Sequence, residues 1–377
     1  MRKIKFINPK SVDILIIDGE GNRHIKPCIP EMASFSILRV RGVIPLIASF
    51  RFIYRVLVHS FKLKRIQDAA LFSLIDILQP KILITFIDAS YLMGKIHAEF
   101  PEKLTISVQN GFRTGPNYSN RTSSCYSKYP VSLFYGFGAH GKNIMDSMGV
   151  KNREYVSAGS LVYDLYKKRS SKETIEKYDV CFIGQHNFSK NNPHMKMLNE
   201  HLDSILLNLI KICKELSLSL AIQMRYEPNT PDYLLELNRV NAIDTKSFAK
   251  IIPNNFADFE GYKSSTQSNI IVTVHSTLGF EMLGIGKKVL FGASIDDYAL
   301  ARFWGALENF NKLPSINLLE SFSENSMRSK LNDLIDMDSN DYMKQTESAR
   351  KYYMNGLDKK GAQELIKARM GEFLSSA

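Results

Sequence analysis

Short apolar segments alternate with helical segments along most of this chain, and most of the apolar segments end in polar residues. In the first half the predicted strands are 12–17, 81–87, 104–108, 132–137 and 154–158, with predicted helices at 68–78 and 89–100. This pattern is typical of a parallel, doubly wound sheet, because a helix returns the chain to the start of the next parallel strand. It constrains the fold more than any other feature, and it predicts the α/β class.

A second alternating series begins after a charged, polar passage at 166–177, which is the best candidate for a linker. Its predicted strands are 179–183, 218–224, 270–274 and 289–291, with a long helix at 194–216. The 377 residues are enough for two domains of about 150–200 residues each. We therefore expect two α/β domains that face a central cleft, 1–165 and 178–325, and helices at 326–377 that pack back towards the first.

The composition argues against several classes of protein. The chain has no apolar run of 18 residues, so no transmembrane helix is predicted, and its first ten residues do not resemble a secretory signal. The four cysteines, Cys28, Cys125, Cys181 and Cys213, lack zinc-binding spacing and are expected to be reduced thiols. These features predict a cytoplasmic protein.

The net charge of +11 predicts an anionic partner. Much of the excess lies between Glu31 and Asp68, where there is no acidic residue. The basic residues there are Arg39, Arg41, Arg51, Arg55, Lys62, Lys64 and Arg65. A helix here would carry Arg51, Arg55, His59 and Lys62 on one face and Phe50, Ile53, Tyr54, Leu57 and Phe61 on another. Residues 39–66 would then either contact an anionic membrane or form a core-packed helix with a solvated basic face. Nucleic acid is not expected, because no RNP, helix-turn-helix or zinc-finger pattern is present.

The most informative segment for function is Asn269–Phe291, which is predicted to form a strand, a polar loop, a helix and a second strand. The loop His275-Ser276-Thr277 would lie at the start of the helix, where backbone N–H groups and the helix dipole favour a phosphate. Gly279 belongs to the same predicted site, and Glu281 could accept hydrogen bonds from a ribose diol. A nucleotide sugar is favoured over a dinucleotide, because no GxGxxG motif accompanies the loop.

Ligands of open α/β sheets bind beyond the carboxyl ends of the strands, so the other polar residues at those ends are candidates. In the second half they are Gly184, Gln185 and Arg225, which suit a phosphate, although Arg225 could instead pair with Glu227. In the first half they are Asp18, Glu20, Asp88, Gln109, Asn110 and Gly111. The three carboxylates are candidates for activating an acceptor hydroxyl, and Asp88 is preferred. The alternatives are a helix cap for Asp88 and structural turns for Asp18, Glu20 and Asn110-Gly111.

One resemblance refines this hypothesis. The run His275-Ser-Thr-Leu-Gly-Phe-Glu-Met-Leu-Gly-Ile-Gly-Lys-Lys-Val289 resembles the nucleotide-side motif of bacterial GT-B glycosyltransferases of surface-carbohydrate synthesis. Those enzymes include the Kdo transferases of capsule and lipopolysaccharide and the transferases of nonulosonic acids. Phe86-Ile-Asp88 and Ser107-Val-Gln-Asn-Gly-Phe-Arg113 resemble a first-domain pattern of the same group. The resemblance implies two facing Rossmann-like domains, a donor site mostly in the second, an acceptor site mostly in the first, and no obligatory metal or other cofactor.

The same resemblance places Ser276, Thr277 and Glu281 against the donor and Asp88 and Asn110 at the cleft, and we add Arg113 to the acceptor side. The chain lacks the His-Pro and Ser-Ser arrangement of several sialyltransferase families. This departure leaves the identity of the nucleotide open: a CMP-linked acid sugar is our first choice of donor, and UDP-linked and other nucleotide-linked sugars are the alternatives. The predicted function is a glycosyltransferase on the inner face of the membrane that builds a surface polysaccharide or a lipid-linked glycan. The alternatives are a sugar-nucleotide epimerase, a polyol-phosphate transferase and a non-enzymatic basic protein that binds anions or nucleic acid.

Overall fold

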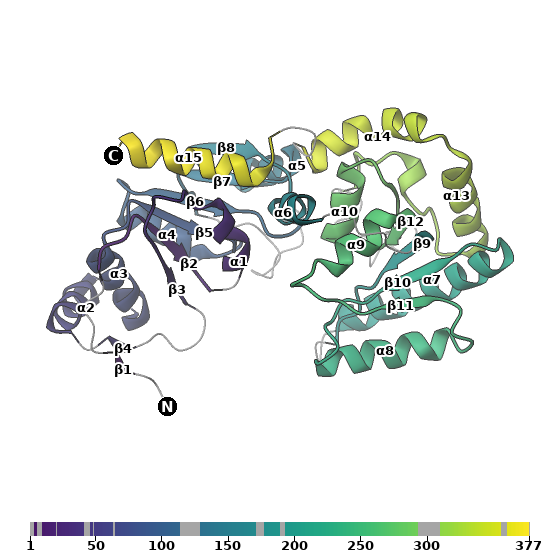
Figure 1. Ribbon diagram of the computed structural model, residues 1–377, viewed down its shortest axis with the longest axis horizontal. Coiled ribbons are helices and arrows are strands. Elements are labelled where there is room, and N and C mark those ends of the chain that lie inside the picture. The colour runs from purple at the N-terminus through teal and green to yellow at the C-terminus, as the bar shows by residue number, and fades with distance from the viewer. Residues whose placement is uncertain are drawn as a thin grey trace.

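The computed structural model describes residues 4–5, 10–19, 21–40, 46–47, 49–62, 65–113, 129–170, 177–188, 193–292, 310–355 and 360–376. Figure 1 shows two lobes, each of which contains a sheet with helices packed on it. Both sheets are parallel throughout, and the predicted α/β class is confirmed. Glu20 and Cys125 lie outside the described residues.

The first lobe contains a six-stranded sheet with the strand order β3-β2-β5-β6-β7-β8. Its strands are β2 (Ile14–Ile17), β3 (Phe35–Leu38), β5 (Ile82–Thr85), β6 (Leu104–Val108), β7 (Leu133–Gly136) and β8 (Glu154–Ser157). In the register of the central strands, Ile14 is opposite Ile82, and Ile82 is opposite Leu104. A separate parallel pair joins β1 (Ile4–Lys5) to β4 (Leu46–Ile47).

Helices cover both faces of this sheet, so its strands are apolar on both sides. Leu15 and Ile17 belong to a core with α3 (Ile66–Leu78), α4 (Tyr91–Glu99) and α5 (Ala139–Ser147). Ile14 and Ile16 point to the other face, as the period of two in a strand requires. The core there includes residues of α1 (Asn22–Ile25), the 3₁₀ helix η1 (Lys26–Cys28) and α6 (Leu161–Arg169). A further helix, α2 (Phe50–Lys62), packs against α3.

The second lobe contains a five-stranded sheet with the strand order β11-β10-β9-β12-β13. Its strands are β9 (Tyr178–Ile183), β10 (Leu220–Gln223), β11 (Lys250–Ile252), β12 (Ser268–Thr273) and β13 (Lys288–Phe291). The helices that follow the first four strands are α7 (Pro193–Glu215), α8 (Pro231–Ile243), α9 (Glu260–Gln267) and α10 (Thr277–Gly284). The central strand β9 lies between β10 and β12, and its residues Val180, Cys181 and Phe182 are fully buried.

The C-terminal helices follow a short 3₁₀ helix, η3 (Ser315–Asn317), and run from the second lobe back to the first (Figure 1). Helix α13 (Glu324–Asp336) packs on α7, and α14 (Ser339–Tyr353) contacts both α10 and α5. Helix α15 (Ala362–Ser376) packs on α6 and η1. The domain limits 1–165, 178–325 and 326–377 stay a prediction.

The prediction of a linker at 166–177 is wrong for its first four residues. Residues 166–169 form the last turn of α6, and Tyr166 is buried there. The hydroxyl groups of Tyr166 and Thr266 share a hydrogen bond of 2.9 Å. Tyr166 is thus an interdomain packing residue, and the basic residues 167–169 belong to the helix; residues 171–176 lie outside the described part of the chain. Within the described part of the chain, no helix is both long enough and apolar enough to cross a membrane.

Candidate functional site

Strand β12, a short loop and helix α10 follow one another, as was predicted for the first part of residues 269–291. Ser276 is the N-cap of α10, and its hydroxyl accepts a hydrogen bond from the N–H of Leu278 at 3.2 Å. Gly279 is buried, and a Cβ there would lie 2.6 Å from Thr273 Cγ2. This glycine therefore lets α10 lie close to β12, and it acts in the structure through packing.

Gln185, directly after β9, fixes the position of this loop. Its Oε1 accepts three hydrogen bonds: from Thr273 Oγ1 at 2.8 Å and from the backbone N–H groups of Val274 and His275 at 3.0 Å each. The side-chain oxygen is thus used within the protein. Gln185 is placed to orient the loop at 275–277.

Arg225 follows β10, and its guanidinium donates to the carbonyl oxygens of Gln185 and His186 at 3.1 Å each. The residue is exposed, and its guanidinium also lies over the Tyr226 ring. The alternative partner that was predicted for Arg225, Glu227, accepts a hydrogen bond from the backbone N–H of Phe256 at 3.2 Å. Arg225 is therefore held beside the loops that follow β9 and β10.

A buried charged cluster lies beneath these two loops, and of its members only His186 follows a predicted strand in the sequence. His186 is fully buried between Asp203, at 3.1 Å, and Glu236, at 3.4 Å. Burial disfavours the charged imidazole, but the hydrogen bonds and charges of the two carboxylates outweigh it and raise the pKa of His186. Glu236 also accepts from the backbone N–H of Arg225 at 3.0 Å. The cluster thus fixes the backbone that carries the guanidinium.

His275 is partly exposed, but its ring nitrogen Nδ1 is buried. Burial, and after it the charge of Arg225, lowers the pKa of His275 to about 3. Its imidazole is therefore neutral at physiological pH. The positive charge beside this loop comes from Arg225 and the start of α10, and His275 contributes only hydrogen-bonding capacity.

Glu281 lies at the contact between the two lobes. It is 2% exposed, and its carboxylate accepts hydrogen bonds from Ser160 Oγ and from Tyr262 OH, the latter at 2.9 and 3.0 Å. Ser160 is the N-cap of α6 in the first lobe, whereas Tyr262 belongs to α9 in the second. Burial raises the pKa of Glu281 to about 7, and the two hydroxyl donors offset part of that rise. Ser160 and Tyr262 are not among the site residues that the sequence predicts.

The first-lobe candidates Asp88, Asn110 and Arg113 come together at the ends of β5 and β6. Asp88 is 1% exposed, and both of its oxygens accept from the Arg113 guanidinium, at 2.5 and 2.9 Å. The same guanidinium donates to Asn110 Oδ1 at 2.5 Å. The helix that follows is capped by Ser90, so Asp88 is not its cap. The aspartate carboxylate is thereby fixed in direction by a bidentate ion pair.

Phe112 connects this cluster to the second lobe, although it was not among the predicted site residues. Its ring lies between the rings of His140 and Phe280, with centroids 4.8 and 3.7 Å away. Its backbone N–H donates to Thr277 Oγ1 at 2.9 Å. The predicted acceptor loop is therefore in direct contact with the predicted donor loop. The sequence signal that could have identified Phe112 is an aromatic residue between Gly111 and Arg113.

The other first-lobe candidates lie beside this cluster. Gln109 bridges its own loop to β7, since Oε1 accepts from the N–H of Phe137 and Nε2 donates to the carbonyl of Gly111. Asp18 ends β2 with a left-handed backbone, φ 76°, and is largely buried. Its loop approaches the end of β5, because a Cβ on Gly21 would lie 2.4 Å from Phe86 Cδ1.

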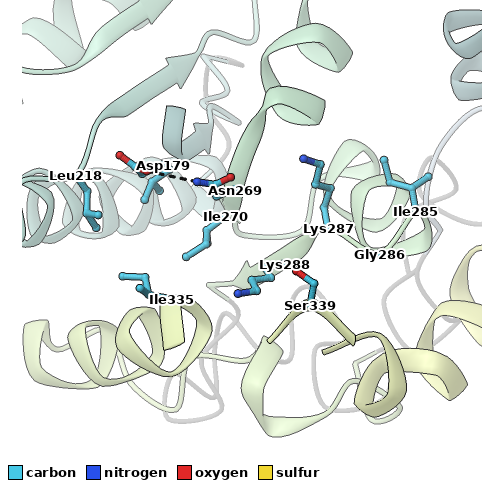
Figure 2. Close-up of a pocket in the computed structure, with 11 residues that line it drawn as sticks. Asp179, Leu218, Asn269, Ile270, Ile285, Gly286, Lys287, Lys288, Ile335 and Ser339 are labelled. Carbon is cyan, nitrogen blue, oxygen red and sulfur yellow. Dashed lines mark hydrogen bonds between the residues drawn. The ribbon is translucent and has the colours of Figure 1, made fainter. Parts of the chain in front are cut away.

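A cavity of about 450 Å³ lies at the opposite edge of the second sheet, where β9, β12 and β13 begin (Figure 2). Two lysines line it, and both donate to backbone carbonyls: Lys287 to Ser268 at 3.0 Å, and Lys288 to Leu334 and Met337 at 2.6 Å. This cavity is separate from the loops that carry the predicted site. No group of three or more His, Cys, Asp or Glu residues that could hold a metal ion is found among the residues that the structure describes.

Comparison with known proteins gives similarity at the level of fold. No protein-family model matches the sequence, and no curated protein matches it. Among solved structures, UDP-GlcNAc 2-epimerase from Neisseria meningitidis bound to UDP-GlcNAc is similar, with a TM-score of 0.57, 14% identity, and 98% of this chain and 100% of that chain covered. The UDP-GlcNAc 2-epimerase of Methanocaldococcus jannaschii in complex with UDP-GlcNAc and UDP has a TM-score of 0.56, 12% identity, and coverage of 98% and 99%.

A glycosyltransferase from Rickettsia africae is also similar, with a TM-score of 0.54, 11% identity, and coverage of 97% of this chain and 100% of that chain. These likenesses extend over whole chains, so they concern the arrangement of both lobes together. They confirm the predicted GT-B fold with two Rossmann-like domains.

Proposed function

We propose that this protein is a nucleotide-sugar-dependent glycosyltransferase that transfers a sugar to a surface polysaccharide or a lipid-linked glycan on the inner face of the membrane. The observation that carries the proposal is the contact between the Asp88–Arg113 cluster and the start of α10 through Phe112 and Thr277. Two sets of residues with complementary chemistry meet there: a carboxylate from the first domain and an anion-favouring helix start from the second.

On the donor side, the nucleotide phosphate would rest against the loop at 275–277 and Arg225. Gln185 supports this arrangement, because it orients the backbone of the loop, and Arg225 is anchored beside it. The ribose hydroxyls would take over hydrogen bonds of Glu281, which requires the carboxylate to exchange its bond with Ser160. Donor binding would thus change the contact between the domains at this one side chain.

On the acceptor side, Asp88 would accept the proton of the acceptor hydroxyl or orient that hydroxyl for attack. The bidentate pair with Arg113 fixes the direction of the Asp88 carboxylate, which would give up one of these hydrogen bonds to reach the acceptor hydroxyl. Asp18 and Glu20 are the second choices, with Gln109, Asn110 and Gly111 forming the acceptor loop. Exclusion of water by the contacting domains would limit hydrolysis of the donor.

For the donor we propose a CMP-linked acid sugar, on the basis of the sequence resemblance at 275–289. One observation favours a second candidate function, a UDP-sugar 2-epimerase: two of the similar folds contain UDP-GlcNAc, and they are epimerases. An epimerase would act on the donor without an acceptor. The two functions are therefore separable by product analysis.

The first experiment is a thermal-shift panel of CMP, CDP, UDP and GDP with the full chain. A nucleotide at 100 times its dissociation constant should stabilise the protein by about 2.7 kcal/mol. Arg225→Ala should reduce that shift, whereas Arg153→Ala, an exposed arginine of the first lobe, should not. No shift with any nucleotide would refute the proposal.

The second experiment incubates the protein with the donor that matches the stabilising nucleotide, with and without a glycan acceptor. A transferase gives an acceptor-linked sugar and free nucleotide. Interconversion of UDP-GlcNAc and its 2-epimer without an acceptor would replace the transferase by the epimerase.

A further inference from the structure

Helix α2 exposes a continuous apolar face to solvent. The side chains of this α2 apolar face are Phe50, Ile53, Tyr54, Leu57 and Phe61. Phe50 is 95% and Phe61 91% exposed, and the other three are more than half exposed. Large apolar side chains that are exposed singly are ordinary, but a contiguous group marks an interaction surface.

The five side chains fall on one side of the helix. At about 100° per residue, positions 50, 53, 54, 57 and 61 lie within an arc of about 100°. The opposite side is used in packing on α3, where Phe52 is buried and His59 Nε2 lies 2.9 Å from Asp76 Oδ2. The helix therefore has two apolar sides, and the core of the protein covers one of them. Its exposed side is not explained by folding.

Basic side chains border this face. Arg51 is exposed beside it, and Arg55, 42% exposed, lies 3.4 Å from Asp76. The next helix continues the pattern, because Arg65 is exposed at its start and Ile66 is 70% exposed. The sequence has no acidic residue between Glu31 and Asp68. Asp76, the acid that contacts Arg55, is also bound by His59, and its side chain is only 18% exposed. The exposed Arg51 and Arg65 therefore give the border of the α2 apolar face a positive charge, which is complementary to an anionic, apolar partner.

We propose that the α2 apolar face binds the surface of an anionic phospholipid bilayer, with its aromatic side chains at the depth of the headgroups. Arg51 and Arg65 contact lipid phosphates in this arrangement. A protein partner could cover the apolar arc, but it would not require exposed arginines beside that arc. The charge pattern therefore selects the lipid surface.

The position of α2 is consistent with this role. The helix lies at the end of the first lobe that is remote from the second lobe (Figure 1). A bound membrane would leave the contact between Phe112 and Thr277 unobstructed. The inference stands on α2 and its neighbours alone, so it does not depend on the transferase proposal.

The test is co-sedimentation of the full chain with vesicles of phosphatidylcholine alone and of phosphatidylcholine with phosphatidylglycerol. We expect binding to the anionic vesicles that weakens as salt is raised, and at least tenfold weaker binding to the neutral ones. Phe50→Ser with Phe61→Ser should lower the partition coefficient on anionic vesicles at least tenfold. Arg51→Gln should lower it about fivefold.

Matched controls use exposed side chains elsewhere. Leu207→Ser with Leu234→Ser removes two exposed leucines from α7 and α8, and Lys344→Gln removes an exposed charge from α14. Both controls should bind like the original chain, and all variants should keep its unfolding temperature. Equal binding to neutral and anionic vesicles, or no effect of the α2 substitutions, would overturn the proposal. So would a concentration-dependent dimer that Phe50→Ser with Phe61→Ser disrupts in a protein that binds no vesicles.

Discussion

Replacing Glu281 by glutamine tests the contact between the two domains at a single titratable group. The carboxylate is almost fully buried, with Ser160 and Tyr262 as its hydrogen-bond donors. Burial raises its pKa from the usual 4.5 to about 7, so the folded chain holds this proton more tightly than the unfolded chain. The resulting stabilisation is present in full below pH 4.5 and is lost as the pH rises through 7.

The magnitude follows from the two pKa values. The shift is 7 − 4.5 = 2.5 units, and each unit corresponds to about 1.36 kcal/mol, which gives about 3 kcal/mol. Glu281→Gln removes this titration. The free energy of unfolding of the variant minus that of the original chain should therefore rise by about 3 kcal/mol between pH 4.5 and pH 8.

The assay is urea unfolding of both proteins at several pH values in this range. All residues other than 281 are common to both proteins, so their contributions cancel in the difference. Glu372→Gln is the matched control, because Glu372 is 70% exposed in α15, and the pH dependence for Glu281→Gln is read against it. A flat difference for Glu281→Gln would show that the carboxylate is solvated, and the inferred packing between Ser160 and α10 would be wrong.

Three further predictions concern the candidate site. Asp88→Asn should keep the nucleotide-induced thermal shift but lower turnover at least a hundredfold in the transfer assay, and near-full activity would remove Asp88 from the catalytic role. His275→Ala should raise the dissociation constant of the donor about tenfold by calorimetry, through the loss of one hydrogen bond of about 1.4 kcal/mol, and unchanged affinity would contradict donor contact. Gly279→Ala should lower the free energy of unfolding by about 1–3 kcal/mol, because its methyl group would collide with Thr273, whereas Gly371→Ala in α15, where nothing lies within 4 Å, should not be destabilising.

The sequence by itself determined the fold class and most of the central strands. Short runs of apolar, often β-branched residues between polar turns are local signals of a buried strand. Strand β6, for example, is found at the predicted residues 104–108. The amphipathic pattern of residues 50–62 is also a local signal, and it predicts helix α2. Strands β3 and β11 were not foreseen, because they are short edge strands with half-buried or exposed residues and thus a weak apolar pattern.

For the site, the sequence could place polar residues after strands, since the carboxyl ends of parallel strands share one edge of a sheet. It could not reveal which side chains pair with one another. Whether Asp88 caps a helix or binds Arg113, and whether Glu281 meets solvent or Ser160, depends on loops that are distant in sequence and adjacent in space. Burial then sets the charge state of His275 and Glu281, and burial is a property of the tertiary structure alone.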